Sequence, residues 1–210
     1  HGLFHNKTQR LWYIGPMFRY ERPQKGRLRQ FNQLGIEMFS NSSYDRDFEV
    51  INLAEKFLSN LSINKNLMLQ INNLGSFNCR SLYKKSLTKY YFQNKKKLSK
   101  DSLIRLEQNP LRILDSKDPD DIEVNYNAPT INNYTSKESK SYFCRLKQLL
   151  KSSNISFCEN PFLVRGLDYY SNSIFEYTLK DNKKYALLAG GSYDNLVKEL
   201  KKLLAANPDI

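Results

Sequence analysis

The fold is decided by residues 10–19, Arg-Leu-Trp-Tyr-Ile-Gly-Pro-Met-Phe-Arg, and by the residues that follow them to Phe39. The first ten are rich in types that favour strands. A polar segment with proline and glycine follows at residues 21–27, and residues 28–39 favour a second strand. The sequence therefore predicts an antiparallel hairpin with a long basic tip.

Side-chain alternation gives this hairpin two different faces, because successive strand residues point to opposite sides. The apolar face, which we expect to pack on helices, holds Leu28, Leu34, Ile36 and Met38. The polar face holds Arg29, Phe31, Gln33, Gly35 and Glu37, with Tyr13, Gly15, Met17, Arg19 and Glu21 from the first strand. An aromatic ring, an amide, a gap at glycine and a carboxylate suit the floor of a pocket for a small polar molecule. The alternative is an ordinary solvated sheet face.

The rest of the chain alternates between helical and strand periodicity. Asp45 or Asp47 is predicted to cap a helix that ends near Leu61, and its apolar face holds Val50, Ile51, Ala54, Phe57, Leu58 and Leu61. Asn66–Asn72 is predicted as a half-buried strand. Further helices are expected within residues 75–105 and at 136–152 and 193–204, with a loop-rich stretch at 109–130. Further strands are expected at 155–157, 173–179 and 185–189, the last ended by Gly190-Gly191.

These elements predict three parts. Residues 1–74 form the first part of a core, residues 75–154 a basic helical insertion, and residues 155–210 the second part of the core. The predicted class is α+β, an antiparallel sheet flanked by helices with a mainly helical insertion.

Composition narrows the chemistry. The 210 residues carry a formal net charge of +12, which favours an anionic partner such as nucleic acid, although a drift toward Lys and Asn would raise the charge equally. Cys79, Cys144 and Cys158 form no CxxC pair, so we expect buried thiols in a reducing cytoplasm and no zinc knuckle. The only histidines are His1 and His5, which argues against a histidine triad or a metal site. No stretch suits a membrane span.

Two later clusters also suit a ligand site. Leu163–Tyr170 places an arginine beside glycine, followed by two tyrosines, although Arg165 and Asp168 would also suit a surface ion pair. Ala189–Asp194 has two glycines that allow close backbone approach, and a plain turn is the alternative.

Together the three clusters resemble the histidyl-tRNA synthetase family. Residues 10–39 resemble its motif 2, Leu163–Tyr170 its first histidine-specific motif and Ala189–Val197 its second; the resemblance extends to about Leu200. It implies a class II synthetase fold, ATP and Mg²⁺ as reaction partners, L-histidine and tRNA(His) as substrates, and a homodimeric cytoplasmic protein with no membrane segment.

The resemblance also implies a role for each matching residue. Arg19 and Arg165 would flank the α-phosphate as the catalytic pair, and the ATP-binding set would be Arg19, Glu21, Arg27 and Phe31. The histidine-binding set would be Gln33, Glu37, Tyr169, Tyr170 and Tyr193. The loop residues that contact tRNA would be Arg22, Gln24 and Lys25. No protein metal ligand is expected, because phosphate oxygens and water would hold Mg²⁺.

The chain departs from the family pattern in several places. Motif 1, motif 3, the Thr-x-Glu loop and the anticodon-binding domain are not found, and Ser192 stands where the second histidine motif normally carries arginine. We therefore expect a fragment with little aminoacylation of its own, and robust ATP–pyrophosphate exchange by the chain would contradict this. The alternatives are a histidine-binding regulatory subunit of ATP phosphoribosyltransferase and an inactive module that dimerises or binds RNA. The charged loop at residues 21–29 favours the synthetase over the regulatory subunit.

Overall fold

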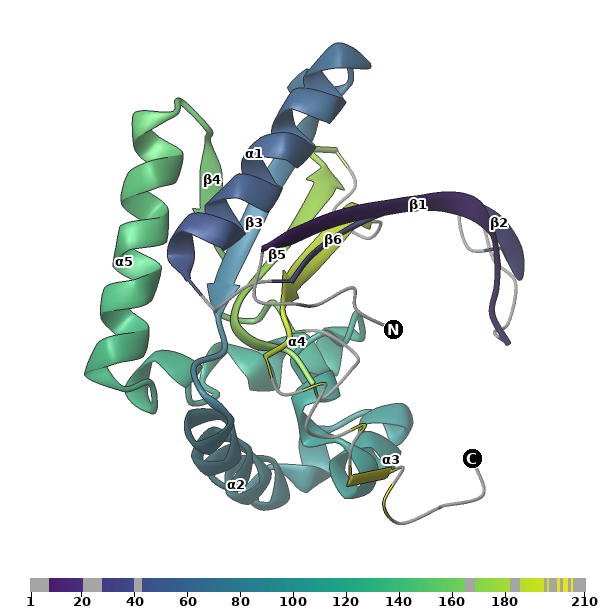
Figure 1. Ribbon diagram of the computed structural model, residues 1–210. Helices are drawn as coiled ribbons and strands as arrows, with labels where there is room; N and C mark the ends of the chain where they lie inside the picture. Colours follow the sequence, from purple (N-terminus) through teal and green to yellow (C-terminus); the bar gives the residue numbers. More distant parts are fainter. Residues whose placement is uncertain are drawn as a thin grey trace.

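The computed structural model describes residues 8–20, 28–39, 43–164, 169–181 and 186–194, with positions 196, 200, 202, 203 and 205. A two-stranded hairpin, a four-stranded sheet and a group of helices make up this part of the chain (Figure 1). The predicted class is confirmed, because the fold is mixed α+β with mainly antiparallel strand pairs.

The predicted hairpin is confirmed. Strand β1 (Gln9–Phe18) pairs antiparallel with β2 (Gln30–Phe39), and Tyr13 lies opposite Gly35. The two strands curve together away from the rest of the molecule as an arm (Figure 1). The predicted tip, residues 21–27, lies outside the described residues.

Helices were expected to cover the apolar face of this hairpin, and along much of its length that expectation is wrong for the described residues. Leu28 and Leu34 are 60% and 39% exposed. Trp12 and Ile14, which lie opposite Ile36 and Leu34 in the hairpin, are 70% and 68% exposed. The arm leaves the body of the molecule (Figure 1), and the helix that follows it, α1 (Tyr44–Asn60), lies beside the inner end of the hairpin. A hydrogen-bonded ion pair between Arg10 and Glu49 joins that end to α1.

The cap of helix α1 lies two residues before Asp45 and four before Asp47, the two predicted caps. The cap is Ser43, whose hydroxyl accepts from the Asp45 N–H, so neither aspartate caps the helix. Serine is a strong cap because its short side chain reaches the free N–H groups of the first turn. Of the predicted apolar face, Ile51, Ala54 and Leu58 are buried, whereas Phe57 and Leu61 are 39% and 53% exposed.

The four-stranded sheet has the order β4-β3-β5-β6. Its strands are β3 (Leu67–Asn73), β4 (Phe157–Glu159), β5 (Ser171–Leu179) and β6 (Ala186–Ser192). Only the β3–β4 pair is parallel. The strands were expected at these places, with small shifts of their bounds.

Gly190 and Gly191 do not end β6, as the sequence suggested, but lie inside it. A Cβ at Gly190 would come within 2.7 Å of the Phe175 ring, and one at Gly191 within 2.7 Å of the Ser173 carbonyl oxygen. The two glycines therefore allow the side chains and backbone of β5 to approach closely. Glycine inside a strand often serves such a close approach instead of ending the strand.

Strand β3 was expected to be half-buried, and this is wrong because both of its faces are covered. Leu69 and Ile71 pack with α1 and α5 (Lys137–Ser152) on one face. On the other, Gln70 donates to Thr178 Oγ1 at 2.9 Å and Asn72 to the Leu163 carbonyl at 2.9 Å. Polar groups tolerate such burial when their hydrogen bonds are satisfied.

A second core lies at one end of the sheet among the remaining helices (Figure 1). Tyr83, Leu87 and Tyr91 are its large buried members from one helix. The elements around it are α2 (Phe77–Gln93), α3 (Lys100–Gln108) and α4 (Pro119–Tyr126). Between these elements the described chain also has short 3-10 helices: η1 (Asn64–Asn66), η2 (Lys95–Lys97), η3 (Pro110–Ile113) and η4 (Ile131–Asn133).

The stretch at 109–130 was expected to be mostly loop, and α4 corrects that expectation. Pro119 stands in the first turn, where a missing N–H costs no helical hydrogen bond, and Asp118 caps the helix by accepting from the Asp120 N–H at 3.0 Å. Helix α5 packs on the sheet together with α1. The three-part division of the chain stays a prediction.

Three predictions about single features remain to be compared with the structure. Cys79 is buried, but Cys144 and Cys158 are exposed, so the expectation of three buried thiols is wrong for two of them. Among the described helices, none combines the length and apolar character needed to cross a membrane. Half of the positions of the predicted helix at 193–204 lie outside the described residues.

Candidate functional site

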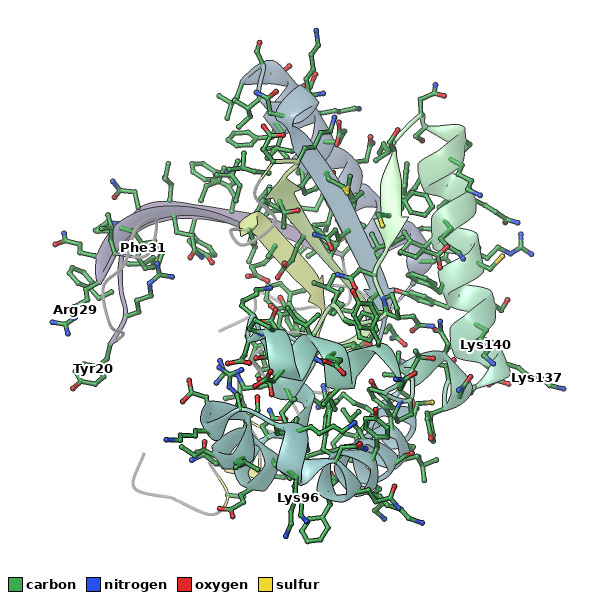
Figure 2. The ribbon with its side chains drawn as sticks, turned by 180° about the vertical axis from the view of Figure 1, so that it is seen from behind. Tyr20, Arg29, Phe31, Lys96, Lys137 and Lys140 are labelled. Atoms are coloured by element: carbon green, nitrogen blue, oxygen red, sulfur yellow. The ribbon has the colours of Figure 1, made fainter. Side chains whose placement is uncertain are left out.

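The outer end of the hairpin joins Arg19 to Phe31. The guanidinium carbon of Arg19 lies 4.3 Å from the centre of the Phe31 ring, and its Nε donates to the Leu28 carbonyl at 2.8 Å. Figure 2 places Phe31 on the arm together with Arg29 and Tyr20. A cation over a ring face is favourable, so this contact fixes the plane of the arginine fork. The outer end therefore offers a fixed positive charge beside an aromatic ring.

The middle of the polar face is occupied by Tyr13. Gln33 Nε2 donates to Tyr13 Oη at 2.8 Å. A Cβ at Gly35 would come within 2.0 Å of the Tyr13 ring. The gap that the sequence suggested at Gly35 is thus filled by a tyrosine ring from the opposite residue of β1. Alternation had placed Tyr13 on this face without giving it a role, and the pairing register supplies it.

The inner end of the hairpin contacts Tyr193, one of three tyrosines whose rings lie together. Glu37 accepts a hydrogen bond from the Tyr193 hydroxyl. The Tyr193 ring lies edge-on to Tyr169 at 6.2 Å between centres, and Tyr169 lies 4.8 Å from Tyr170. Segments more than 130 residues apart in sequence therefore meet at one carboxylate, and we call Glu37, Tyr169, Tyr170 and Tyr193 the tyrosine cluster.

The electrostatics of the cluster keep Tyr193 a donor. Burial raises the pKa of its hydroxyl, and the Glu37 carboxylate raises it further by accepting the hydroxyl hydrogen and by its charge. A tyrosine with a raised pKa remains protonated at neutral pH. Glu37 thus keeps a hydrogen bond from Tyr193 and retains further acceptor positions for a ligand.

A buried arginine supports the cluster from the helical side. Arg80 of α2 is 8% exposed, and its Nη1 donates to the Tyr170 carbonyl at 2.5 Å. The Tyr170 ring packs against the core of the helical group. Sequence reasoning missed Arg80, because it stands among other basic residues on a helix and only its tertiary partner distinguishes it.

The predicted site residues thus fall into three groups. Glu37 meets Tyr193, whose ring lies against Tyr169 and through it Tyr170, Arg19 meets Phe31, and Gln33 lies between these groups on the same strand face. The remaining predicted site residues lie outside the described residues: Glu21, Arg22, Gln24, Lys25, Arg27 and Arg165.

The fold that carries these groups is the catalytic-domain fold of a class II aminoacyl-tRNA synthetase. Its solved relatives include apo histidyl-tRNA synthetase from S. aureus, with 32% identity and a TM-score of 0.67 over 91% of this chain and 45% of that one. A family model described as histidyl-tRNA synthetase matches residues 1–207. The chain belongs to the histidyl-tRNA synthetase family.

More distant structures share the fold. An ATP phosphoribosyltransferase regulatory subunit/histidyl-tRNA synthetase from Bacillus halodurans is 19% identical with a TM-score of 0.59, covering 94% of this chain and 55% of that one. Histidyl-tRNA synthetase from Nostoc sp. PCC 7120 is 17% identical with a TM-score of 0.58, covering 100% of this chain and 56% of that one. The chain therefore spans about half the length of these structures.

Proposed function

We propose that this chain carries the histidine- and ATP-binding half of a histidine–tRNA ligase, which activates L-histidine with ATP and transfers it to tRNA(His). The observation that carries the proposal is the tyrosine cluster at Glu37, together with family membership. The same proposal includes a homodimeric cytoplasmic protein.

Recognition of histidine would use the tyrosine cluster. Glu37 would accept from one imidazole nitrogen and Tyr170 would contact the other, with Tyr169 and Tyr193 lining the ring. Gln33 would hold the amino acid further along β2. A site that hydrogen-bonds both ring nitrogens rejects analogues without them by about 10⁴ in favourable cases, because its own polar groups would stay unpaired.

ATP would lie along the outer part of the polar face. Arg19 would neutralise the α-phosphate from one side and Arg165 from the other, and Phe31 would stack on the adenine. Glu21 would contact the adenine amino group, and Arg27 would reach the γ-phosphate. The contact of Arg19 with Phe31 supports this placement, since it puts a permanent cation beside an aromatic ring.

The reaction needs no protein base. The carboxylate oxygen of histidine attacks the α-phosphorus, the bond to the β-phosphate oxygen breaks, and pyrophosphate leaves. A hydroxyl of the terminal tRNA adenosine then attacks the acyl carbon, and AMP leaves. The protein positions the groups and stabilises the charge on the transferring phosphate.

Mg²⁺ would accompany the phosphates. The described residues contain no group of three His, Cys, Asp or Glu side chains that could hold a metal ion. Phosphate oxygens and water would supply most of the ligands of Mg²⁺, which would add positive charge at the outer phosphates.

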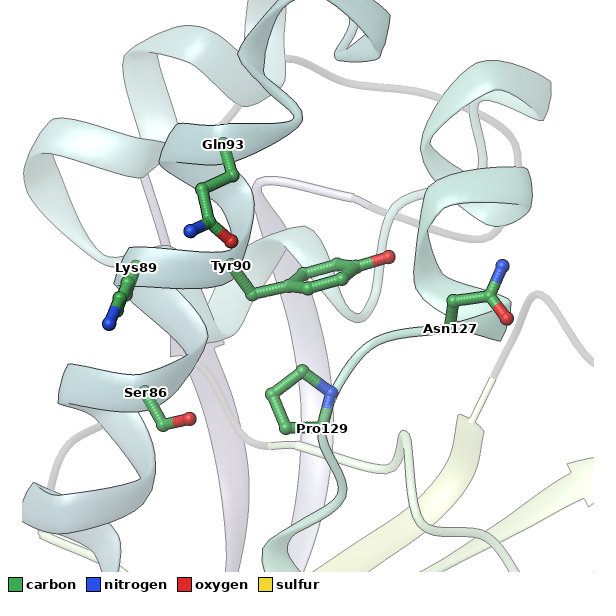
Figure 3. Close-up of a pocket in the computed structure, with 6 residues that line it drawn as sticks. All are labelled: Ser86, Lys89, Tyr90, Gln93, Asn127 and Pro129. Carbon is green, nitrogen blue, oxygen red and sulfur yellow. The ribbon is translucent and has the colours of Figure 1, made fainter.

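tRNA would contact the hairpin tip through Arg22, Gln24 and Lys25, and the helical group through its basic face. Lys89 lines a hollow of about 350 Å³ with Ser86, Gln93 and Asn127 (Figure 3). Nearby, Phe92 is 62% exposed, with the Lys95 ammonium 4.8 Å from its ring centre. Exposed rings beside lysines suit stacked bases and phosphates, and such binding weakens with salt.

Calorimetric titration of L-histidine into the chain tests the proposal. The Glu37→Gln variant should bind roughly ten- to a hundredfold more weakly, because it loses a charge-assisted acceptor. Glu159→Gln is the matched control, since Glu159 pairs with Lys147 and lies on β4, at the opposite edge of the sheet from β6, and it should bind as the parent does. A parent chain that binds no histidine, or equal affinity in the Glu37→Gln variant, contradicts the proposal.

The fold match with the Bacillus halodurans regulatory subunit/synthetase favours a second candidate, a histidine-binding regulatory subunit. ATP titration separates the two. A synthetase half binds ATP and loses affinity on Arg19→Ala, whereas a regulatory binder takes histidine and ignores ATP.

A further inference from the structure

A buried carboxylate network lies beside the tyrosine cluster and reaches Tyr193 through the chain. Asp47, in the first turn of α1, accepts hydrogen bonds from hydroxyls on three other elements. Tyr142 of α5 donates at 2.6 Å, and Ser173 of β5 donates to the same oxygen. Ser192 of β6 bridges both carboxylate oxygens at 2.8 and 2.9 Å. Asp47 therefore joins four elements at one point.

Ser192 is the member of this network that leads to the site. It is the last residue of β6, and the next residue is Tyr193, whose hydroxyl donates to Glu37. Beyond Tyr193 the chain is fixed again, because Asp194 accepts from Ser171 Oγ and Asn172 Nδ2, both at 3.0 Å. Tyr193 thus stands between two anchored residues.

The two anchors also relate Tyr193 to the other tyrosines. Ser171 and Asn172 directly follow Tyr170, so the Asp194 contacts tie the ends of both tyrosine segments together. Asp47 fixes the same region to α1 and α5. Loss of the Ser192 bridge would leave the pairing of Ser192 with Ser171 in place but would remove the side-chain contact that ties the residue before Tyr193 to α1.

We propose that Asp47 is a positioning residue for histidine binding, acting through Ser192 to hold the Tyr193 hydroxyl against Glu37. The inference rests on the proposed function, and it adds a determinant to a site whose ligand contacts all lie elsewhere. Asp47 touches no predicted ligand group itself. Its role is to fix the position of the Tyr193 hydroxyl, which donates to Glu37. That position decides which acceptor positions of Glu37 remain for the imidazole.

Two variants that remove one hydroxyl each test this. Ser192→Ala breaks the bridge toward Tyr193, and Tyr142→Phe removes a hydroxyl from the same carboxylate on the side facing α5. Both variants should lower the melting temperature. Only Ser192→Ala should weaken L-histidine binding, by about tenfold, because a misplaced donor costs about one charge-assisted hydrogen bond. Ser192→Thr, which keeps the hydroxyl, should restore the affinity.

A second measurement needs no ligand. In NMR spectra of the chain with carbon-labelled tyrosine rings, assigned with Tyr193→Phe, the Tyr193 signals should move in Ser192→Ala and stay in Tyr142→Phe. Unchanged Tyr193 signals, or equal histidine affinity in the two variants, overturn the inference. A parent that binds no histidine while its Tyr193 signals respond to Ser192→Ala overturns the proposed function and leaves the positioning contact established.

Discussion

Replacement of Asp121 by alanine should remove much of the stability of the helical group. Asp121 of α4 is fully buried, at 0% exposure. It accepts from the Ser99 N–H at 2.9 Å, Ser99 Oγ at 2.8 Å, Ser102 Oγ at 2.6 Å and Ser116 Oγ at 2.5 Å. The carboxylate thus joins the start of α3 and the turn before α4 to one buried point.

The magnitude follows from those four donors. Each hydrogen bond to a charged group contributes about 1.5–3 kcal/mol, but the sum overstates the loss, because freed hydroxyls find water and the cost of burying the carboxylate disappears. We expect Asp121→Ala to lower the free energy of unfolding by about 3–5 kcal/mol. Asp121→Asn keeps the volume and one acceptor oxygen, and should cost roughly 1–2 kcal/mol.

The assay is urea unfolding followed by far-ultraviolet circular dichroism, which reports the helices directly. Fluorescence is unsuitable, because the single tryptophan, Trp12, lies on the hairpin arm and is 70% exposed. An Asp121→Ala chain within about 0.5 kcal/mol of the parent would refute the reasoning, since that is the range of neutral surface substitutions.

The same residue predicts an acid-sensitive stability. Burial alone would raise the pKa of Asp121, but the serine hydrogen bonds outweigh it, so the pKa lies below the ordinary 3.8. The unfolded chain then binds the proton more readily, and the stabilisation is present above about pH 3.8 and lost as the pH falls through the lowered value. The stability difference between parent and Asp121→Asn should therefore shrink in acid.

Three further predictions concern the site. Burial raises the pKa of Asp47 above its ordinary 3.8. The stabilisation that protonated Asp47 contributes is therefore complete below pH 3.8 and is lost as the pH rises through the raised pKa. The melting temperature of the parent, relative to that of Asp47→Asn, should fall from acid to neutral pH. Gly191→Ala places a Cβ within 2.7 Å of a backbone carbonyl oxygen and should cost about 1–3 kcal/mol in urea unfolding. Arg80→Gln removes the charged donor to the Tyr170 carbonyl, and histidine titration should show roughly tenfold weaker binding, with unchanged affinity counting against the link.

Local rules gave much of this molecule from the sequence alone. Strand alternation predicted the hairpin and put Arg19, Phe31, Gln33 and Glu37 on one face, because a period of two depends only on neighbouring residues. The resemblance of three sequence motifs to the histidyl-tRNA synthetase family predicted the family, which the comparisons show. The helix of residues 44–60 was also predicted, but its cap was not, because serine and aspartate compete for the role and backbone geometry decides.

Long-range contacts decided the rest. The sequence contains both Tyr193 and Glu37, but only the tertiary fold brings the hydroxyl to the carboxylate. Asp47 resembles a helix cap until three distant hydroxyls meet it, and Arg80 resembles a surface charge until Tyr170 accepts from it. Which distant residues meet depends on how whole helices and strands pack, and a single sequence does not contain those distances. The tertiary structure therefore decided which residues support the tyrosine cluster.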